Sequence, residues 1–504
     1  MSETVSRRYR LLRRLSISFM SCAIIVAVLS TAYCLYRWNR VGQIPDIGDP
    51  FDVEAWLVPD LPDDENAATV YRRAFQLLGN ATAPLPDGTP LWHAMREPPV
   101  ADEELFLEVT LPLCQLLRQG AAMPHALFTR PQDVSIEVQG VEDGDFVRQT
   151  FRLVQARSRI LRTRGELNEA MLDLTGVVAL ARHLSAKGSF IQHLTANPVE
   201  ALTLEEIRDC AGDSKMTAEL AASSLADLRR LQITPGASDI LKVEYLYSMK
   251  YFFSPEALEG YRLFHEEMYG KFGLTRDGTV LGPLSRPFPV IGCTSRIEVE
   301  RAKRLLKLAT ANLLAACELP PYERPAVVEE AVKVQSAGIS AFRRETIELF
   351  DLEGMSDSLQ VSREASGRQV CQWLATTPWL VEDSVRSASV LVPFDRIAAR
   401  RGITETFLAL RAWQIRHGKY PETLGELVGH DLDALPLDPF SGRPFGYVRA
   451  SGQVLRHAGP GESQYQTKAD DWLLYSVGPD KIDQQASVEC VYGSGSGDWI
   501  FLLP

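Results

Sequence analysis

The stretch "LRAWQIRHGKYP", residues 410–421, is the place where helical periodicity in this sequence ends and strand-like periodicity begins. Four apolar residues at or just before it fall at helical steps on one face: Ile403, Phe407, Leu410 and Trp413. Gly418 is a stop signal, and Pro421 lies just beyond it, where proline does not disturb a helix. We therefore predict a long helix from about residue 394 to residue 417, followed by strands and turns.

Short strand-like segments follow this helix. In "LPLDPFSGRPFGYV" (435–448) the turn formers Asp438-Pro439 and Gly442 precede an alternating pair of apolar residues, Phe445 and Tyr447. A second alternation begins "LLYSVGPDKID" (473–483). Alternation with a period of two indicates strands, so we predict a small antiparallel sheet packed on the long helix.

The region before residue 391 is helical in pattern. Its clearest part is a helical pair joined by a tight turn at Arg164-Gly165-Glu166. The two apolar stripes are Phe151, Val154 and Leu161, then Ala170, Leu174, Val177, Ala181 and Leu184. The pair resembles one tetratricopeptide-type α-hairpin, but no second copy follows at a period near 34 residues, so an irregular helical domain is the favoured interpretation.

The N-terminus predicts a membrane anchor. Residues 15–36, "LSISFMSCAIIVAVLSTAYCLY", form an uncharged run long enough for a spanning helix of about 20 residues. Five arginines precede it and acidic residues follow it, so the positive-inside rule leaves residues 1–14 in the cytoplasm and exports the bulk of the chain. The alternative is a cleaved signal peptide, whose apolar core is shorter, about 7–15 residues. We expect a single-pass protein of the inner membrane.

The expected fold class is mainly α, with an N-terminal transmembrane helix, an exported irregular helical domain and a small C-terminal α+β domain. The expected boundaries are 1–14 for the cytoplasmic tail, 15–36 for the transmembrane helix, 37–62 for an extended tether, 63–391 for the helical domain and 392–504 for the α+β domain.

Composition excludes some functions. The 504-residue chain has a net charge of −12, which argues against a nucleic-acid partner because such a partner needs a basic face. None of the eight cysteines forms a CxxC pair, so a zinc or redox motif is unsupported.

Motifs that carry chemistry are weak throughout. "HEEMY" (265–269) lacks the second histidine of a zinc-protease helix. "GSGSGD" (493–498) matches neither a phosphate loop nor a nucleophile elbow. We interpret His183 and His193 as ordinary helix or loop histidines, and the pairs Glu205-Glu206 and Glu329-Glu330 as solvated helix faces.

Four segments in order, 410–429, 435–448, 473–483 and 497–499, resemble the globular part of the major pseudopilin of type II secretion systems. That family has a helix ending in G-x-Y-P, a P-x-D-P turn, a Y-S-x-G-x-D loop and a terminal Asp before Trp. The resemblance covers roughly residues 395–504. It implies a similar α+β fold, and pilus assembly through residues 15–36 is not expected because that run contains no Glu.

The resemblance also implies a calcium ion in the 473–483 loop. By motif position the candidate ligands are Asp480, with Asp498 at the final acidic position and Asp483 as a substitute, helped by carbonyl oxygens near residues 475–478. Lys481 stands where the family has Gly, which places a cation beside this site. The alternative is a β-turn with solvated aspartates.

The whole chain resembles uncharacterised envelope proteins with one anchor. We expect a non-enzymatic, membrane-anchored envelope protein that binds a protein partner or has a structural role. The alternative is an exported hydrolase whose catalytic residues form no local motif.

Overall fold

The structure, a computed structural model, describes these residues: 17–21, 24, 25, 27, 28, 31, 32, 35, 39, 46–57, 61–80, 103–130, 139–231, 233, 236–252, 296–323, 391–452, 454–457, 463–468, 471–478, 481–486 and 498–503. The 265–269 segment, residues 493–497, Glu329-Glu330 and Asp480 lie outside them.

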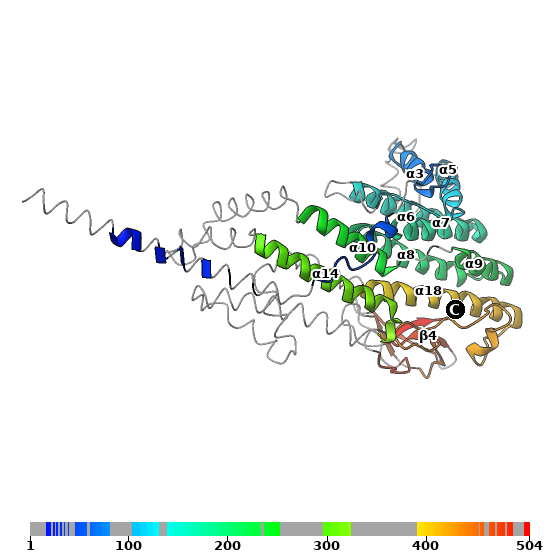
Figure 1. Cartoon of the computed structure of the whole chain (residues 1–504). Helices are drawn as coiled ribbons and strands as arrows, with labels where there is room; N and C mark the ends of the chain where they lie inside the picture. Colours follow the sequence, from blue (N-terminus) through cyan, green and yellow to red (C-terminus); the bar gives the residue numbers. More distant parts are fainter. Residues whose placement is uncertain are drawn as a thin grey trace, which may run out of the picture. The chain divides into compact units, whose positions relative to one another are not determined.

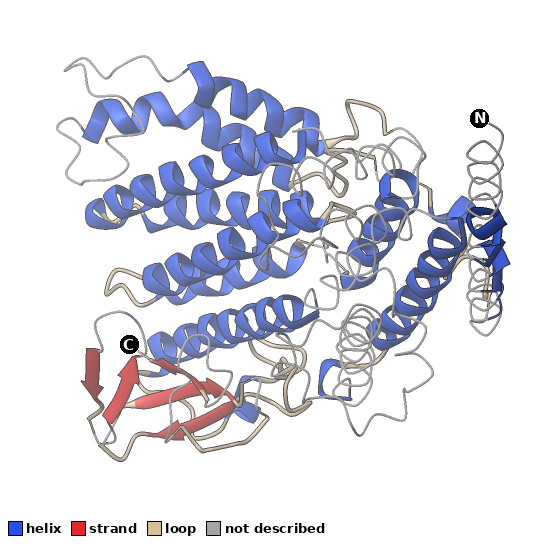
Figure 2. Ribbon diagram, turned by 90° about the vertical axis from the view of Figure 1, so that its left-hand side faces the viewer, coloured by secondary structure: helices blue, strands red, loops and turns tan. Residues whose placement is uncertain are grey.

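The protein is mainly helical, with a small antiparallel sheet near its C-terminus, as predicted (Figures 1 and 2). Its longer helices are α3 (Ala67–Asn80), α5 (Glu103–Ala121), α6 (Gln139–Arg164), α7 (Leu167–Ser185), α8 (Phe190–Ala211), α9 (Ala218–Arg230), α10 (Ala237–Tyr247), α14 (Arg296–Glu318) and α18 (Leu391–His417). Shorter helical segments are α2 (Val53–Trp56), η2 (Ser248–Phe252), η3 (Pro321–Glu323) and η7 (Leu424–Leu427).

The chain divides into two compact units. The first comprises Met1–Pro50, Met249–Ala309 and Val332–Ser384, and the second comprises Phe51–Ser248, Thr310–Ala331 and Val385–Pro504. In the described part of the first unit, Lys307 lies 3.7 Å from an Asp46 carboxylate oxygen and 4.0 Å from one of Asp49. Helices α2 to α10, helix α18 and all the strands belong to the second unit.

The predicted helical pair is confirmed as α6 and α7. Both predicted apolar stripes are buried. Gly165 makes the turn with a φ of +84°, a left-handed conformation that glycine adopts without the steric cost of a Cβ. Nearly every residue of α7 after its first turn is buried, because α5, α6 and α8 all pack against it.

The helices of the second unit lie in successive layers (Figures 1 and 2). Helices α3 and α5 pack on each other, α5 and α6 pack on α7, and α8 packs on α7. Helix α18 packs against α8 and α9 on one side and contacts β4 of the sheet. One hydrophobic cluster runs through these layers, from Ala67 in α3 to Leu503 after the last strand.

Helix α18 confirms the predicted long helix. It ends at His417, and Gly418 follows with a φ of +73°. Ile403, Phe407 and Leu410 are buried, and Trp413 is partly buried against the same cluster. Its burial on two sides explains why the helix has apolar residues around much of its circumference rather than one narrow stripe.

The sheet orders its three strands β1-β4-β5, all antiparallel. Its strands are β1 (Gly446–Arg449), β4 (Trp472–Ser476) and β5 (Trp499–Leu502), while β2 (Val454–His457) and β3 (Ser463–Gln466) form a separate antiparallel ribbon. Gly446 pairs with Tyr475, and the tyrosine ring fills the space that a Cβ at residue 446 would need. The predicted antiparallel sheet next to the long helix is therefore confirmed.

The segment expected as an extended tether contains a short helix that docks on the helical body. Asp52 caps α2, because its side chain accepts a hydrogen bond from the Ala55 N–H. Trp56 Nε1 donates to Asp239 over 3.2 Å, and Phe51 packs edge-on against Tyr245 with ring centroids 5.6 Å apart. Aromatic contacts with α10, which sequence periodicity does not reveal, hold this segment in place.

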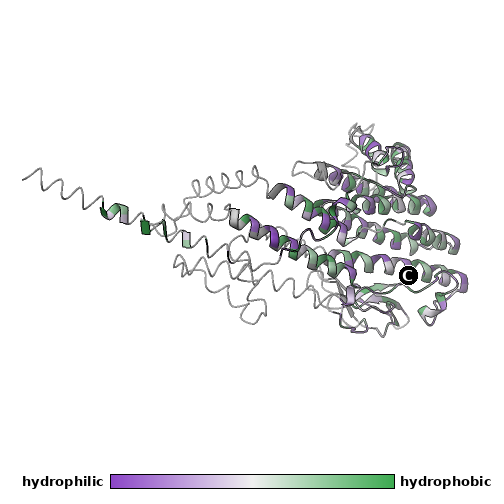
Figure 3. Ribbon diagram, in the orientation of Figure 1, coloured by the Kyte–Doolittle hydropathy of each residue, from purple (hydrophilic) through white to green (hydrophobic). Residues whose placement is uncertain are grey.

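The described residues of the 15–36 run are helical and mostly hydrophobic (Figure 3). Their large apolar side chains are exposed. Among the residues that the structure describes, none of the helices combines the length and the apolar character of a membrane span.

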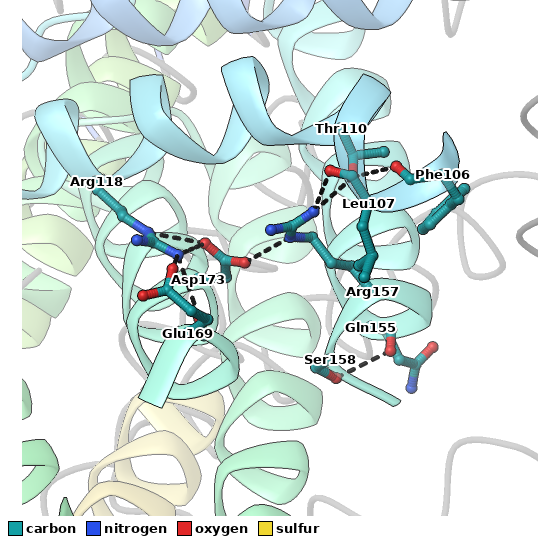
Figure 4. A network of polar contacts seen from close by, with 9 residues as sticks. All are labelled: Phe106, Leu107, Thr110, Arg118, Gln155, Arg157, Ser158, Glu169 and Asp173. Carbon is teal, nitrogen blue, oxygen red and sulfur yellow. Dashed lines mark hydrogen bonds and ion pairs between the residues drawn. The ribbon is translucent and has the colours of Figure 1, made fainter. Parts of the chain in front are cut away.

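A buried carboxylate joins three helices. Asp173 of α7 is fully buried and accepts hydrogen bonds from Arg118 Nε of α5 over 2.8 Å and from Arg157 Nε of α6 over 2.9 Å (Figure 4). Arg157 also donates to the Leu107 carbonyl oxygen and to Thr110 Oγ1. Each charge thus has partners, which a buried ion pair needs to offset the loss of hydration.

We predict that Asp173→Asn lowers the free energy of unfolding by ~3–5 kcal/mol, because two guanidiniums lose their shared carboxylate inside the protein. Asp227→Asn is the control. Its partner Arg230 is 74% exposed, so we expect a loss of less than ~1 kcal/mol. Urea unfolding of the full chain, followed by circular dichroism, measures both. Equal losses in the two variants would contradict the prediction.

Candidate functional site

The C-terminal loop after β4 is anchored by Asp438. This residue is 1% exposed. Its Oδ1 accepts hydrogen bonds from the Phe440 N–H over 3.0 Å and from Ser476 Oγ over 2.9 Å, and its Oδ2 accepts one from the Val477 N–H over 2.9 Å. Burial raises the pKa of Asp438, and these hydrogen bonds oppose the rise. The carboxylate therefore joins the Asp-Pro turn to the end of β4.

Two of the three predicted calcium ligands instead shape the loop that follows. Asp498 is fully buried, and its two oxygens accept from the N–H groups of Gln484 over 3.3 Å and Ala486 over 2.8 Å. Asp483 is exposed, and its Oδ1 accepts from the Tyr475 hydroxyl over 3.1 Å and from the Gln485 N–H over 2.8 Å. The alternative prediction, a β-turn with solvated aspartates, is wrong for Asp498 because this residue is buried. Asp483 is exposed, as that alternative expects, but it also accepts the two hydrogen bonds from Tyr475 and Gln485.

The backbone of this loop explains why it needs such support. Lys481, Gln485 and Ala486 have φ values of +61°, +55° and +56°, which are uncommon for residues other than glycine. Carboxylates that bind the N–H groups of residues 484–486 offset part of that cost. Burial first, and then the charge of Asp483, raise the pKa of Tyr475, so its hydroxyl remains a hydrogen-bond donor.

Lys481 makes hydrogen bonds to the backbone of η3. Its Nζ donates to the carbonyl oxygens of Pro321 and Tyr322, each over 3.3 Å. Tyr322 in turn packs against Gly442, whose φ is +69°. The lysine that departs from the pseudopilin pattern thus links the loop to η3.

Asp483 and Asp498 alone supply too few oxygens for a calcium ion. Calcium needs about six to eight oxygens converging on one point. The oxygens of Asp483 and Asp498 meet N–H and O–H donors instead, and the described residues hold no group of three His, Cys, Asp or Glu side chains suited to a metal. Asp480 lies outside the described residues, so its role as a ligand stays a prediction.

Asp498 could act as a calcium ligand or as a hydrogen-bond acceptor for the loop backbone, and the effect of calcium on the stability of an Asp498 variant distinguishes these two roles. We predict that Asp498→Ala lowers the thermal unfolding midpoint of the full chain by the same amount in calcium and in a chelator, because the lost contacts are hydrogen bonds to the backbone. Differential scanning fluorimetry measures this, with Asp433→Ala, on the exposed turn before β1, as the control. A loss of stability seen only with calcium would restore Asp498 as a ligand.

A second buried charge cluster lies where α7, α8 and α18 meet. Glu200 is 2% exposed, and its Oε1 accepts from Arg182 Nε over 2.8 Å and from Arg401 Nε over 2.6 Å. Arg401 Nη2 also donates to the other oxygen over 2.7 Å. Burial acts to raise the pKa of Glu200, but Arg401 and Arg182 outweigh it and lower the pKa to about 2.

The predicted ordinary histidines are buried with hydrogen-bond partners. His183 Nδ1 lies 2.9 Å from the Tyr71 hydroxyl. His193 Nδ1 lies 2.8 Å from Ser185 Oγ, its Nε2 lies 2.7 Å from Asn197, and Phe394 stacks on its ring. Although Ser185 and His193 form a nucleophile–base pair in residue type, His193 is fully buried, so a substrate has no access to its ring.

The prediction that Glu206 is solvated is wrong. Glu205 is exposed, but Glu206 is 7% exposed and accepts hydrogen bonds from Gln155 and Arg159 of α6. Its neighbours come from about fifty residues away in sequence, which a local charge pattern does not reveal.

We predict that stability falls as the pH drops from about 6.5 to about 4. Burial lowers the pKa of His183 to about 4, and burial together with Arg401 lowers that of His193 to about 3. The unfolded chain binds protons at these residues near pH 6.5, while the folded chain does not. Below that pH, each histidine therefore lowers the free energy of unfolding by up to ~1.4 kcal/mol for every pH unit.

Thermal unfolding midpoints of the full chain between pH 7 and pH 5 test this. The double variant His183→Gln/His193→Gln is expected to lose less of its midpoint over that range than the unmodified chain. His417→Gln, at an exposed position, is the control and should fall as the unmodified chain does. A double variant with the same acid sensitivity would refute the assignment.

Comparisons with known proteins give no relatives: neither a family model nor a curated protein nor a solved structure matches this chain.

Proposed function

We infer that this protein is a membrane-anchored scaffold of the cell envelope, which displays a helical body and a pseudopilin-like C-terminal module to a protein partner. The observation that carries the proposal is the N-terminal run. Its described residues are helical, and Ile17, Phe19, Met20, Ile24 and Leu35 are more than half exposed. Large apolar side chains exposed along a helix favour a lipid environment, and the five preceding arginines favour an exported C-terminal side.

Two features support a scaffold rather than an enzyme. Buried acids and histidines of the second unit stabilise the fold through hydrogen bonds with neighbouring side chains, as Asp173, Glu200 and His193 illustrate. Helix α18 also packs against both the helical body and strand β4 of the sheet. The C-terminal module is therefore held in a fixed orientation relative to that body. A rigidly displayed module suits a structural or binding role.

Alkaline phosphatase fusions test the anchor and its orientation. We expect a fusion after residue 45 to be active and to stay with the membrane after carbonate extraction. Replacement of Arg7, Arg8, Arg10, Arg13 and Arg14 by Gln should reduce that activity, because the positive-inside signal is lost. Active enzyme in the soluble fraction would show a cleaved signal peptide instead, and an inactive fusion would contradict export.

Photo-crosslinking in cells tests which part meets the partner. Leu437, in the C-terminal module, is 56% exposed, and Val109 on α5 is 48% exposed, so a photoreactive residue at either site is a matched probe. We expect a protein adduct of discrete mass from residue 437 and none from residue 109. The reverse pattern would move the partner to the helical body.

A further inference from the structure

Two arginines lie side by side where α8, α18 and β5 meet. Arg208 of α8 is 7% exposed; its Nη1 donates to Thr404 Oγ1 over 2.7 Å, and its guanidinium lies 4.9 Å from the ring centroid of Phe501. Arg400 lies one helical turn before Thr404, and its guanidinium is 5.9 Å from the centroid of Trp499. Trp499 and Phe501 are two residues apart on β5 and so share one face of the strand.

Arg396 extends this cluster by one more turn of α18. Residues four apart on a helix are neighbours on its surface, so Arg396 lies next to Arg400 on the same face of α18. Its Nε is buried and has no hydrogen-bond partner among the residues that the structure describes. The α18 face thus carries Arg396, Arg400 and Thr404 in a row, with Arg208 bound to the last of them.

Among the described residues, no ion pair neutralises the positive charge of this cluster. In the part of the chain that the structure describes, neither Arg208, Arg396 nor Arg400 forms an ion pair, whereas Arg401 on the same helix shares Glu200 with Arg182. Three carboxylates lie within three residues of Arg208 on α8. Glu206 accepts hydrogen bonds from Gln155 and Arg159, while Glu205 and Asp209 are exposed and act on Arg208 only through their charge, which opposes the effect of burial on its pKa. Burial, and next the charge of Arg400, lower the pKa of Arg208 to about 10.

A buried cation without a counter-charge is costly, and guanidiniums on adjacent helical turns repel one another. A bound anion removes both costs. Guanidinium forks match the oxygens of phosphate and similar oxyanions in geometry and in charge. We propose that Arg208, Arg396 and Arg400 form a binding site for an oxyanion of the phosphate type. The inference is independent of the proposed envelope function.

Titration of inorganic phosphate into the full chain tests the site. The protein is held in phosphatidylcholine nanodiscs, ionic strength is kept constant with sodium chloride, and the thermal unfolding midpoint is recorded. An anion that binds only the folded state raises the midpoint in a saturable manner. We expect that rise in the unmodified chain, with Arg400→Gln and Arg396→Gln each needing at least about tenfold more phosphate, because each loses charge-assisted hydrogen bonds.

Arg416→Gln is the matched control, since Arg416 lies on the same helix but binds the carboxylate of Asp431. It should respond to phosphate as the unmodified chain does. Arg208→Met is a further variant: it removes the buried charge, so its midpoint in chloride should not fall and its response to phosphate should disappear. Should this variant fail to fold, the Arg396 and Arg400 variants, at less buried positions, decide the question.

Nanodiscs containing phosphatidylglycerol distinguish the source of the phosphate group. A midpoint raised by these lipids in the unmodified chain, but not in Arg400→Gln, assigns the site to a lipid headgroup. A response to free phosphate alone assigns it to a soluble anion. The proposal is overturned if neither raises the midpoint, if the rise does not saturate, or if Arg396→Gln and Arg400→Gln respond like the unmodified chain.

Discussion

The carboxylate of Glu200 receives guanidiniums from two different helices, Arg182 of α7 and Arg401 of α18, inside the protein. A single buried carboxylate in this position is intolerant of change, because removal of any one partner leaves a charge without compensation. It also sets the register of α18 against the helical body, since apolar side chains alone permit sliding along a groove whereas a hydrogen-bonded charge does not.

Other polar contacts extend that registration along α18. Arg411 donates to the carbonyl oxygens of Ala211 and Asp213, at the C-terminal end of α8, where helical carbonyl groups lack partners within the helix. Arg229 of α9 pairs with Glu405. The opposite side of α18 is held by apolar contact, with Phe407, Phe445 and Leu474 in one cluster. Polar contacts thus specify the position of the helix, and hydrophobic burial beneath the sheet supplies much of the stabilisation.

Local signals in the sequence were sufficient to predict the individual helices and the places where they end. The stripes of α6 and α7 follow from a period of 3.6, and the end of α18 follows from Gly418, because both depend on neighbouring residues only. The roles of Asp173, Glu206 and Asp438 depend on partners tens of residues away, which periodicity does not contain. The 473–483 loop shows the same limit: its motif suggested ligands, yet the left-handed backbone at Gln485 and Ala486 directs Asp498 toward amide groups.

The separation between Glu200 and Arg401 has a consequence for how the chain is made. The two residues are 201 positions apart, so a ribosome completes α8 long before it supplies the second guanidinium. Until then Glu200 has Arg182 alone, and the faces of α8 and α9 that later meet α18 remain open to water. Folding of this unit is therefore completed only after synthesis of its last quarter, and a prematurely terminated chain exposes apolar surface of the kind that chaperones and proteases recognise.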